Sequence, residues 1–443
     1  MTARPVEDEG PATKDLALAI WGLFVGLALL LVASGLFGTL IGVRSELRHL
    51  PTAVSGLISA AYYAGFLAGS RLTLDALLRV GHIRVYAALA SLLSAAILGL
   101  GMASAPVSWA ALRFITGVCI AGQYVVAESW LNDLADNDNR GRLLSIYLVV
   151  TSGAFGVGQL LLNSFDPRAL TGFAIASILT SLAIAPVTLS EADAPATEGR
   201  EHISMRELAK VVPTGVGACF LVGAAHGALT GMAAIYATRV GLSPGRTALF
   251  VAAPTIGGVV FQWPIAAASD DVDRRAVGIA AALGAGVAAL LLLLGPATSP
   301  MAIALMALLG GASYPLYSIA AAYTNDWVDP AHVNAAASQL VTLYGLGAIV
   351  GPFLAAVLMT TSGPTGFYWS MIALHAAIVA FLVYRRRAWR APLVERPWRE
   401  VSVPARVFFI PATVVAMGRR IRSPADGVDP RAGSGEPADD IEC

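Results

Sequence analysis

The sequence predicts an all-α membrane protein with twelve transmembrane helices arranged as two pseudo-symmetric six-helix bundles. Three observations support this prediction. First, 56% of the 443 residues are hydrophobic and only 13% are charged, whereas soluble domains are roughly 45–50% apolar and about 25% charged. Second, apolar runs of about 20 residues, long enough to cross the hydrocarbon core of a membrane, recur along the whole chain. Third, short motifs of the first half return in the second half.

Twelve apolar segments form the predicted spans. They cover residues 18–41, 54–76, 85–104, 108–131, 142–163, 169–189, 212–238, 246–268, 276–295, 300–323, 335–360 and 366–384. With the N-terminus inside, fifteen of the Lys and Arg residues up to Arg390 face the cytoplasm and five face the outside. This asymmetry obeys the positive-inside rule, and it predicts that both termini are cytoplasmic. Only Lys14 and Lys210 are lysines, a bias typical of GC-rich bacteria, so we expect a multi-pass protein of the bacterial inner membrane.

The spans and the polar segments between them define five predicted regions. These are a cytoplasmic tail at 1–17, a six-helix bundle at 18–190, a cytoplasmic linker at 191–211, a second six-helix bundle at 212–384 and a cytoplasmic, largely disordered tail at 385–443. Apolar and charged residues interleave at 203–211, which indicates a short helix on the inner membrane surface or a plain linker. The segment 403–417 is short for a span and is predicted to be interfacial, with a thirteenth span as the alternative.

The two halves of the chain share short motifs at one offset. Gly158 in the fifth span lies 193 residues before Gly351 in the eleventh, and Gly81 lies 192 residues before Asp273. Two matches at nearly the same spacing suggest a duplication. Parallel six-helix repeats are one of the known transporter plans, with the substrate held between the halves near the middle of the membrane.

Several functional classes are excluded by the sequence. The net charge is zero and the basic residues are spread over many loops, which gives no electrostatic footprint for nucleic acid. Cys119 and Cys219 lie inside apolar spans and Cys443 is the last residue, so neither a disulfide framework nor a metal site is indicated. The loops contain no nucleotide-binding motif, no His-Glu-x-x-His helix and no Gly-x-Ser-x-Gly elbow. We therefore predict neither an enzyme nor a bound cofactor or metal.

A loop between the eighth and ninth spans resembles a known family motif. Residues 266–275 read Ala-Ala-Ala-Ser-Asp-Asp-Val-Asp-Arg-Arg, which is similar to the major facilitator signature Gly-x-x-x-Asp-Arg-x-Gly-Arg-Arg. Asp270, Arg274 and Arg275 match this signature. The departures from it are Ala266, Asp271 and Asp273. The loop falls where the second copy of the motif belongs in that family.

Further motifs follow the family's order along the chain. Arg79 and Gly81 remain from an eroded first copy of the loop motif, between the second and third spans. Residues 113–117 resemble the Arg-x-x-x-Gly motif, and residues 347–352 resemble the helix-packing motif Gly-x-x-x-Gly-Pro through Gly347, Gly351 and Pro352. The segments that look like a YcaD-like bacterial branch of the superfamily are 128–132, 140–145 and 262–264. The resemblance covers roughly residues 16 to 390.

This resemblance implies a major facilitator fold and a secondary transporter that moves an unidentified small solute by alternating access. Efflux of varied compounds and movement of a defined metabolite both stay open, as does proton coupling. The alternative is a non-transporting membrane sensor or scaffold, favoured by the eroded first loop motif and the long tail. The expected partners are the solute, membrane lipid and, if transport is coupled, protons. We expect a monomer.

The resemblance also implies a cytoplasmic gate made of charged loop residues. It pairs Arg79 with an acid on the fourth span, for which Glu128 is the candidate, and it places a second charged cluster in the other half. The gate residues are Arg79, Gly81, Glu128, Asp270, Arg274 and Arg275. The alternative is that these charges are solvated anchors that fix the topology.

Polar residues inside the spans are candidates for a substrate or proton cavity. Arg113 is the clearest, because a charge inside a span costs at least roughly 2.5–3.5 kcal/mol and calls for a partner or a water-filled cavity. His226, with Thr230 one turn later, could bind a proton or a substrate group, or could be a packing histidine. The other candidates are Gln123, Tyr124, Gln159, Gln262, Tyr314, Tyr317 and Tyr344.

No predicted span carries Asp or Glu near its centre. In a proton-coupled carrier His226 would therefore have to bind the proton, unless coupling lies elsewhere or the protein is a uniporter.

Overall fold

The structure is a computed structural model that describes residues 13–134, 140–189, 204–329 and 332–388. These residues form helices and no strand. The first helices are α1 (Thr13–Leu47), α2 (Thr52–Val80), α3 (His82–Met102), α4 (Pro106–Leu134), α5 (Arg140–Leu160), η1 (Leu161–Ser164), α6 (Thr171–Leu182) and α7 (Ile184–Thr188). After the short α8 (Met205–Val211) come α9 (Pro213–Arg239), α10 (Pro244–Asp271), α11 (Arg274–Leu294), α12 (Pro300–Ser313), α13 (Pro315–Asn325), α14 (Val333–Thr361), η3 (Gly363–Thr365) and α15 (Gly366–Ala388).

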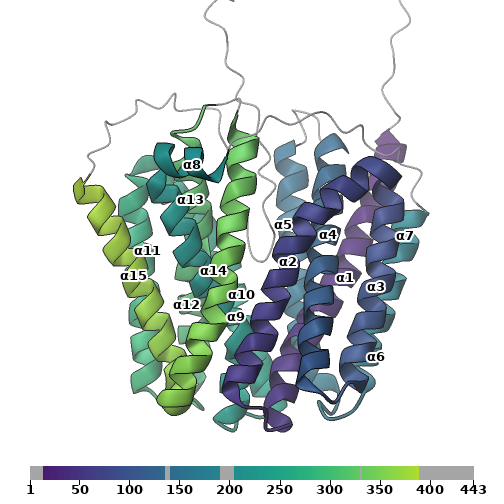
Figure 1. The fold of residues 1–443 in the computed structure, drawn as a ribbon, viewed down its shortest axis with the longest axis horizontal. Coiled ribbons are helices and arrows are strands. Elements are labelled where there is room, and N and C mark those ends of the chain that lie inside the picture. Colours follow the sequence, from purple (N-terminus) through teal and green to yellow (C-terminus); the bar gives the residue numbers. More distant parts are fainter. Residues whose placement is uncertain (1–12, 135–139, 190–203, 330–331, 389–443) are drawn as a thin grey trace, which may run out of the picture.

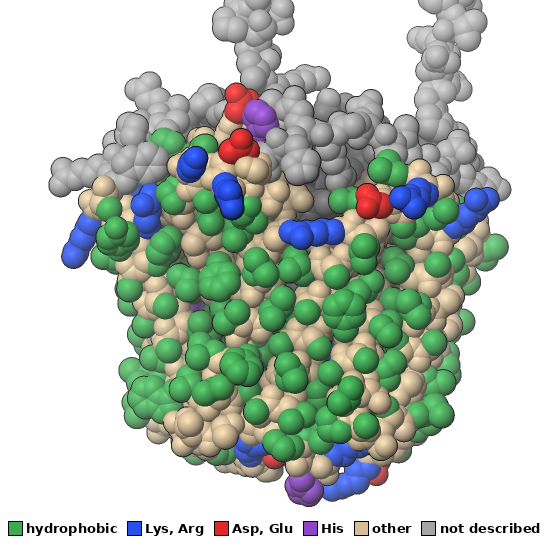
Figure 2. Space-filling view, in the orientation of Figure 1, with side chains coloured by type: hydrophobic (Ala, Val, Ile, Leu, Met, Phe, Trp, Pro, Cys, Tyr) green, Lys and Arg blue, Asp and Glu red, His purple; other side chains and the backbone are tan. Residues whose placement is uncertain are grey.

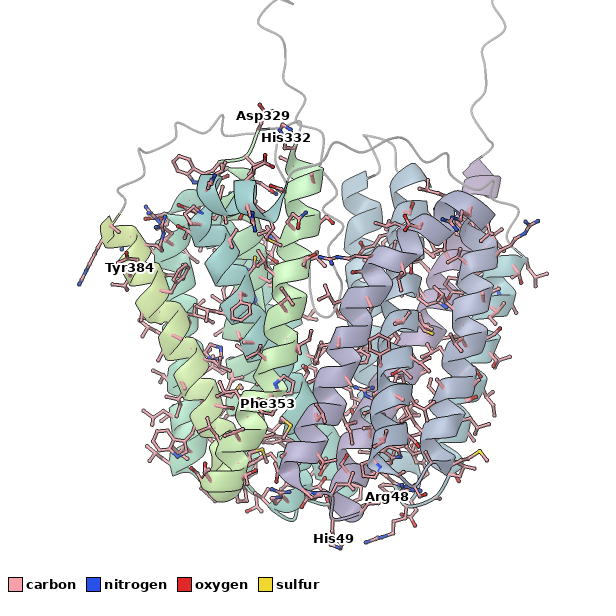
Figure 3. The ribbon with its side chains drawn as sticks, viewed as in Figure 1. Arg48, His49, Asp329, His332, Phe353 and Tyr384 are labelled. Carbon is pink, nitrogen blue, oxygen red and sulfur yellow. The ribbon has the colours of Figure 1, made fainter. Side chains whose placement is uncertain are left out.

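The helices form two groups that lie side by side, as Figure 1 shows. We call α1 to α7 the first half and α9 to α15 the second half. One end of the molecule carries Arg48 and His49 and is called the Arg48 end (Figure 3). The opposite end carries α8, Asp329 and His332 and is called the α8 end (Figures 1 and 3).

The helices agree with the predicted spans. Eleven helical segments of the described residues are long and apolar enough to cross a membrane, and they follow eleven of the twelve predicted spans in order. The predicted span 142–163 falls on α5 and η1, which are not among the eleven. α5 has 21 residues, about 31 Å at the rise of an α-helix, and it packs against α1 and α10. Arginines at its start and several Gly, Ser and Thr residues make it less apolar than the others, yet it completes the bundle.

Two spans are interrupted next to a proline. α6 and α7 meet at Ala183, shortly before Pro186, and α12 and α13 meet at Tyr314, directly before Pro315. Proline lacks a backbone N–H and therefore removes one i→i−4 hydrogen bond of the helix. Each pair nevertheless acts as one span, since the eleven segments include Thr171–Thr188 and Pro300–Asn325.

The packing of α1 on α5 repeats in the packing of α9 on α14. Gly35 of α1 faces the carbonyl group of Phe155 so closely that a methyl group would overlap it, and Gly227 of α9 faces the carbonyl group of Ala348 in the same way. Each residue of the second contact follows its counterpart in the first by 192 or 193 residues, the spacing at which the sequence motifs repeat.

A second pair of contacts obeys the same rule. Gly65 of α2 faces the carbonyl group of Phe114 on α4, and Gly257 of α10 faces the carbonyl group of Ala307 on α12. The motif offset again relates the first contact to the second. Small residues let neighbouring helices approach closely in a membrane, where packing rather than the hydrophobic effect holds helices together. The two halves are therefore repeats in structure as well as in sequence.

The surface has the polarity expected of a membrane protein. Figure 2 shows hydrophobic side chains over the middle of one face, while the charged side chains gather at the Arg48 end and the α8 end. A band of apolar surface between two charged rims is the arrangement that a bilayer favours.

The central linker contains the helix α8. Its start is fixed by a capping box, in which the Ser204 hydroxyl accepts from the Glu207 N–H at 3.3 Å and the Glu207 carboxylate accepts from the Ser204 N–H at 2.8 Å. Leu208 is buried. A position of α8 on the membrane surface stays a prediction, as do the domain boundaries. The segment 403–417 lies outside the described residues.

Candidate functional site

A cavity of about 70 Å³ lies between the two halves. By the same measure one water needs roughly 10–15 Å³, so the cavity has room for several waters or a small solute. Residues of α1, α2, α4 and α5 line it from the first half, and residues of α9 and α10, together with Tyr314 at the α12–α13 break, line it from the second. Its polar lining consists of Ser34, Thr39, Tyr62, Tyr63, Arg113, Gln159, Thr230 and Tyr314. Four of these were predicted from the sequence: Arg113, Gln159, Thr230 and Tyr314.

Arg113 brings a positive charge into this cavity. The residue is only 8% exposed. Its guanidinium carbon lies 4.3 Å from the centroid of the Tyr62 ring and 5.7 Å from that of the Phe37 ring. Its Nε has no hydrogen-bond partner among the described residues. Arg113 is also the one charged residue in the described lining of the cavity.

The close packing of α2 on α4 explains why Arg113 meets an aromatic ring. Gly65 faces the Phe114 carbonyl group and Gly117 faces the Tyr62 carbonyl group, in both cases without room for a side chain. The two backbones therefore run together at this point, and the side chains of Tyr62 and Arg113 share the space beside them. The Arg-x-x-x-Gly motif thus supplies both the charge and the close contact that positions it.

Polar contacts join the two halves around the cavity. The hydroxyl groups of Tyr63 on α2 and Thr230 on α9 form a hydrogen bond. The Ser59 hydroxyl donates to the Gly231 carbonyl at 3.1 Å, and the Thr255 hydroxyl donates to Gln159 Oε1 at 3.4 Å. The boundary between the halves is therefore a polar seam.

His226 lies behind the cavity wall. Its Nε2 donates to the Ser313 carbonyl at 3.0 Å, and its Nδ1 lies 3.1 Å from the Tyr344 hydroxyl, from which it accepts in the neutral ring. Its ring is 4.8 Å, centroid to centroid, from that of Tyr314, which lines the cavity. Both ring nitrogens are thus occupied within the protein. His375 continues this chain of contacts, because its Nε2 accepts from the Ser313 hydroxyl at 2.9 Å.

The structure distributes the other predicted cavity residues over several environments. Gln123 donates to the Tyr86 carbonyl at 3.0 Å inside the first half. Tyr124 is buried against the Phe66 ring. Gln262 donates to the Ser318 hydroxyl at 3.0 Å inside the second half. Tyr317 and Tyr344 form an edge-to-face pair with a centroid distance of 5.1 Å, and Tyr344 also lines a small secondary pocket between the halves with Tyr62 and Tyr63.

The second-half residues of the predicted gate form an ionic cluster around two buried arginines. Arg274 is 7% exposed and donates to Asp326 at 2.8 Å and to Asp270 at 2.9 Å. Arg275, equally buried, pairs with Asp273 at 3.2 Å. The contacts of Arg274 join the start of α11 to the end of α10 and to Asp326, directly after α13, within the second half. The alternative of solvated anchors does not fit Arg274 and Arg275, because both are buried and paired.

The first-half residues of the predicted gate are arranged differently. Arg79 is exposed at the end of α2. Gly81 has a φ of 83°, a conformation that glycine adopts readily, and it forms the turn into α3. Glu128 is 7% exposed and accepts from the Tyr147 hydroxyl of α5 at 3.2 Å.

The predicted helix-packing motif lies on α14. Gly347 faces the Phe220 carbonyl group and Gly351 faces the Ala224 carbonyl group of α9, and neither has space for a side chain. Pro352, next to Gly351, approaches Gly56 of α2. The motif therefore lies where α14 contacts α9 of the second half and α2 of the first half.

Comparison with known proteins identifies the family. The sequence profile of the Major Facilitator Superfamily matches residues 23–245 and 215–421, so the matches cover both halves. The chain belongs to the Major Facilitator Superfamily. This confirms the family predicted from the loop motif at 266–275, and it places the protein among transporters rather than enzymes.

Bacterial relatives confirm the predicted branch of the superfamily. The chain is 30% identical over 339 residues to the uncharacterized MFS-type transporter YcaD of Escherichia fergusonii, which is 76% of this chain and 88% of that protein. It is 30% identical over 376 residues to the MFS-type transporter Ent638_1421 of Enterobacter sp. strain 638, which is 84% of this chain and 96% of that protein. The chain is thus a multi-pass protein of the bacterial inner membrane.

Solved transporters share the fold. A mutant of the nucleoside transporter NupG superposes with a TM-score of 0.71 at 12% identity, over 84% of this chain and 100% of that chain. A bacterial homologue of the human lysosomal transporter Spinster, in an inward-facing and occupied conformation, superposes with a TM-score of 0.70 at 15% identity, over 86% of this chain and 98% of that chain. These matches confirm the major facilitator fold. With the family, they show a secondary transporter of an unidentified small molecule and do not favour a sensor or scaffold.

Several residues of the site were missed by the sequence prediction. Tyr62, Tyr63 and Phe37 line the cavity, and two adjacent tyrosines in an otherwise small-residue stretch of α2 were the available signal. Asp326, the partner of Arg274, lies beyond the predicted tenth span and resembles an ordinary loop residue. Glu46 was missed because α1 continues to Leu47, past the predicted end of the first span.

Proposed function

We propose that the protein carries a small solute by alternating access, with the cavity around Arg113 as its binding site. One observation carries the proposal: the polar cavity lies on the seam between two structurally repeated halves and contains a buried arginine. Rocking of one repeat against the other would expose such a site first to one end of the molecule and then to the other.

An ion pair at the Arg48 end supports a closed state on that side. Arg239 of α9 pairs with Glu46 of α1 at 2.7 Å and donates to Thr52 of α2, also at 2.7 Å. The pair therefore bridges the two halves. We infer that the Glu46–Arg239 pair seals the Arg48 end in this conformation and that the solute enters from the α8 end.

One contact between the two halves lies nearer to the α8 end. The hydrogen bond from Arg71 to Thr342 is long, at 3.3 Å, and Arg71 is exposed. Closer to the α8 end, the ionic cluster of Arg274 lies within the second half. We propose that this cluster keeps α10, α11 and α13 together as a rigid unit while the halves move, and that Arg79 and Glu128 complete the gate on the first half.

The excess of Lys and Arg on the predicted inner loops supports a cytoplasmic position for the α8 end and for both termini. We further propose that the protein works as a monomer in contact with lipid.

In proton-coupled transport, His226 would have to release the Tyr344 hydroxyl in order to bind a proton at Nδ1, because its Nε2 already donates to Ser313. Such a step would link protonation of His226 to Tyr344 and, through the neighbouring ring of Tyr314, to the cavity that Tyr314 lines.

A reversible cross-link tests the proposal. In a chain without Cys119, Cys219 and Cys443, the double substitution Glu46→Cys and Arg239→Cys places two thiols across the seam. Oxidation should stop solute flux in proteoliposomes and reduction should restore it, for a solute first identified by thermal stabilisation of the purified protein. The single variant Glu46→Cys is the control and should not respond to oxidation. Flux that persists through the cross-link, or no flux of any solute that binds, would refute alternating access at this seam.

A further inference from the structure

Arg113 differs from the other buried and half-buried arginines of the described chain. Arg44 and Arg48 donate to backbone carbonyl groups, at 2.9 Å and 2.7 Å in their shortest contacts. Arg239 and Arg274 pair with carboxylates. The Arg113 guanidinium lies near two aromatic rings and has no carbonyl or carboxylate partner among the described residues, although the residue is more than nine-tenths buried.

No acid of the described chain is in a position to neutralise Arg113. The cavity lining contains no Asp or Glu among its described residues. The nearest acid along α4 is Glu128, about four helical turns further on, which is roughly 22 Å at the rise of a helix. Ring faces attract a cation, but they do not replace the hydrogen bonds that a guanidinium loses when it leaves water. The charge therefore lacks a partner among the residues that the structure describes.

We propose that the solute is a small organic monoanion whose carboxylate, or a similar oxyanion, pairs with Arg113. This inference rests on the proposed function and names its substrate class. A planar guanidinium presents paired N–H donors that match the two oxygens of a carboxylate. Because Arg113 is the one charge in the described lining, one negative charge neutralises the cavity. A dianion would leave a net charge in a site of low dielectric constant.

The surroundings of Arg113 define the rest of the ligand. The rings of Tyr62 and Phe37 approach the guanidinium from two helices, and its Nε has no acceptor among the described residues, so N–H donors remain for the anion. Gln159, Tyr63 and Thr230 line the same cavity and can bind hydroxyl or carbonyl groups of the solute. A volume of about 70 Å³ selects a molecule of few heavy atoms in this conformation. The geometry thus favours short, polar monocarboxylic acids.

Binding to the purified, full-length protein tests this inference with matched probes. Pyruvate and lactate should raise the thermal unfolding midpoint, whereas their neutral amides and the dianion succinate should raise it much less. Arg113→Gln should weaken acid binding at least tenfold. Arg113→Lys keeps the charge but loses the planar fork, so its affinity for the acids should lie between those of the unaltered protein and of Arg113→Gln. Arg48→Gln is the matched control, because Arg48 also lies over a ring, that of Trp109 at 5.0 Å, but outside the cavity; it should bind the acids as the unaltered protein does.

A second readout needs no ligand. If Arg113 awaits an anion, removal of its charge relieves an unfavourable burial, so Arg113→Gln without ligand should unfold at the same temperature as the unaltered protein or higher. A large fall in its midpoint would show that the charge is stabilised without a ligand and would overturn the inference. Equal binding of acids and amides, or acid binding that survives Arg113→Gln, would overturn it as well.

Failure of this inference and failure of the proposed function give different results. Flux of a neutral or cationic solute, with no binding of the acids, would refute the anion and leave alternating access standing. Binding of the acids through Arg113, without flux of any solute in proteoliposomes, would refute transport and leave the anion site standing.

Discussion

Arg113 and Arg274 are buried to almost the same degree, at 8% and 7% exposure, yet their surroundings differ. Arg274 lies at the end of the second half between Asp270 and Asp326. Arg113 lies at the seam between the halves and faces a cavity and two aromatic rings. A buried charge with its partners inside one half holds that half together. A buried charge without a partner, at the boundary that has to open, is suited to bind a ligand.

The largest expected effect comes from Arg274→Gln. This substitution removes the Arg274 guanidinium from its contacts with Asp326 and Asp270. Loss of one partner of a fully buried pair costs about 3–5 kcal/mol, but the side chains of Asp326 and Asp270 are 25% and 48% exposed, so we expect about 2 kcal/mol after solvent screening. The thermal unfolding midpoint of the purified protein should fall clearly.

Arg386→Gln provides the matched control. Arg386 also pairs with an aspartate, Asp273 at 3.3 Å, but its side chain is 52% exposed. Its replacement should change the midpoint very little. Equal midpoints for the Arg274 and Arg386 variants would contradict the structural role of the buried cluster.

A smaller effect is expected at Tyr62, whose ring lies beside the Arg113 guanidinium. Tyr62→Leu removes the ring face and should destabilise the protein by about 1–2 kcal/mol, because the half-buried Tyr62 lies between exposed cation–π contacts, at about 0.5–1 kcal/mol, and desolvated ones, at about 2 kcal/mol or more. Tyr62→Phe keeps the ring and should cost much less. In the Arg113→Gln background the Tyr62→Leu penalty should shrink, because the cation is gone. Strictly additive penalties would show that Tyr62 stabilises the fold by packing alone.

The smallest expected effect is that of Glu46→Gln. The Glu46 and Arg239 side chains are 19% and 22% exposed, and such a pair contributes about 1 kcal/mol or less. Its loss should therefore increase the population open at the Arg48 end by up to about fivefold. Spin labels at Arg168→Cys and Thr298→Cys, both exposed near that end, would report longer distances in the variant. An unchanged distance distribution would argue against a seal at this pair.

The sequence predicted the fold well because a membrane imposes strong rules. Hydrocarbon thickness determines span length, and close helix contacts require glycine at defined positions such as Gly158 and Gly351. Both signals are local and can be read without the structure. The offset between the sequence motifs then reappeared in the contacts of Gly35 and Gly227.

The site was predicted only in part, because its remaining features depend on contacts between distant segments. Arg113 stood out since a charge inside an apolar span is costly. Tyr62 did not, because a tyrosine in a span is common and only packing on α4 brings it to Arg113. Gln123 is on the same helix as Arg113, yet it binds the backbone of α3. Glu46 and Arg239 looked like separate anchors in different halves of the chain, although they form one ion pair.

Accessibility of a thiol in the cavity tests the central claim most directly. Gly38 lines the cavity, and a side chain added there meets open space, so Gly38→Cys should fit in a chain without the native cysteines. A membrane-impermeant thiol reagent should label it from the α8 side. With Glu46→Gln added, labelling from the Arg48 side should become faster, by up to about fivefold. Labelling that stays one-sided in both variants, or no labelling from either side, would contradict alternating access at the Arg113 cavity.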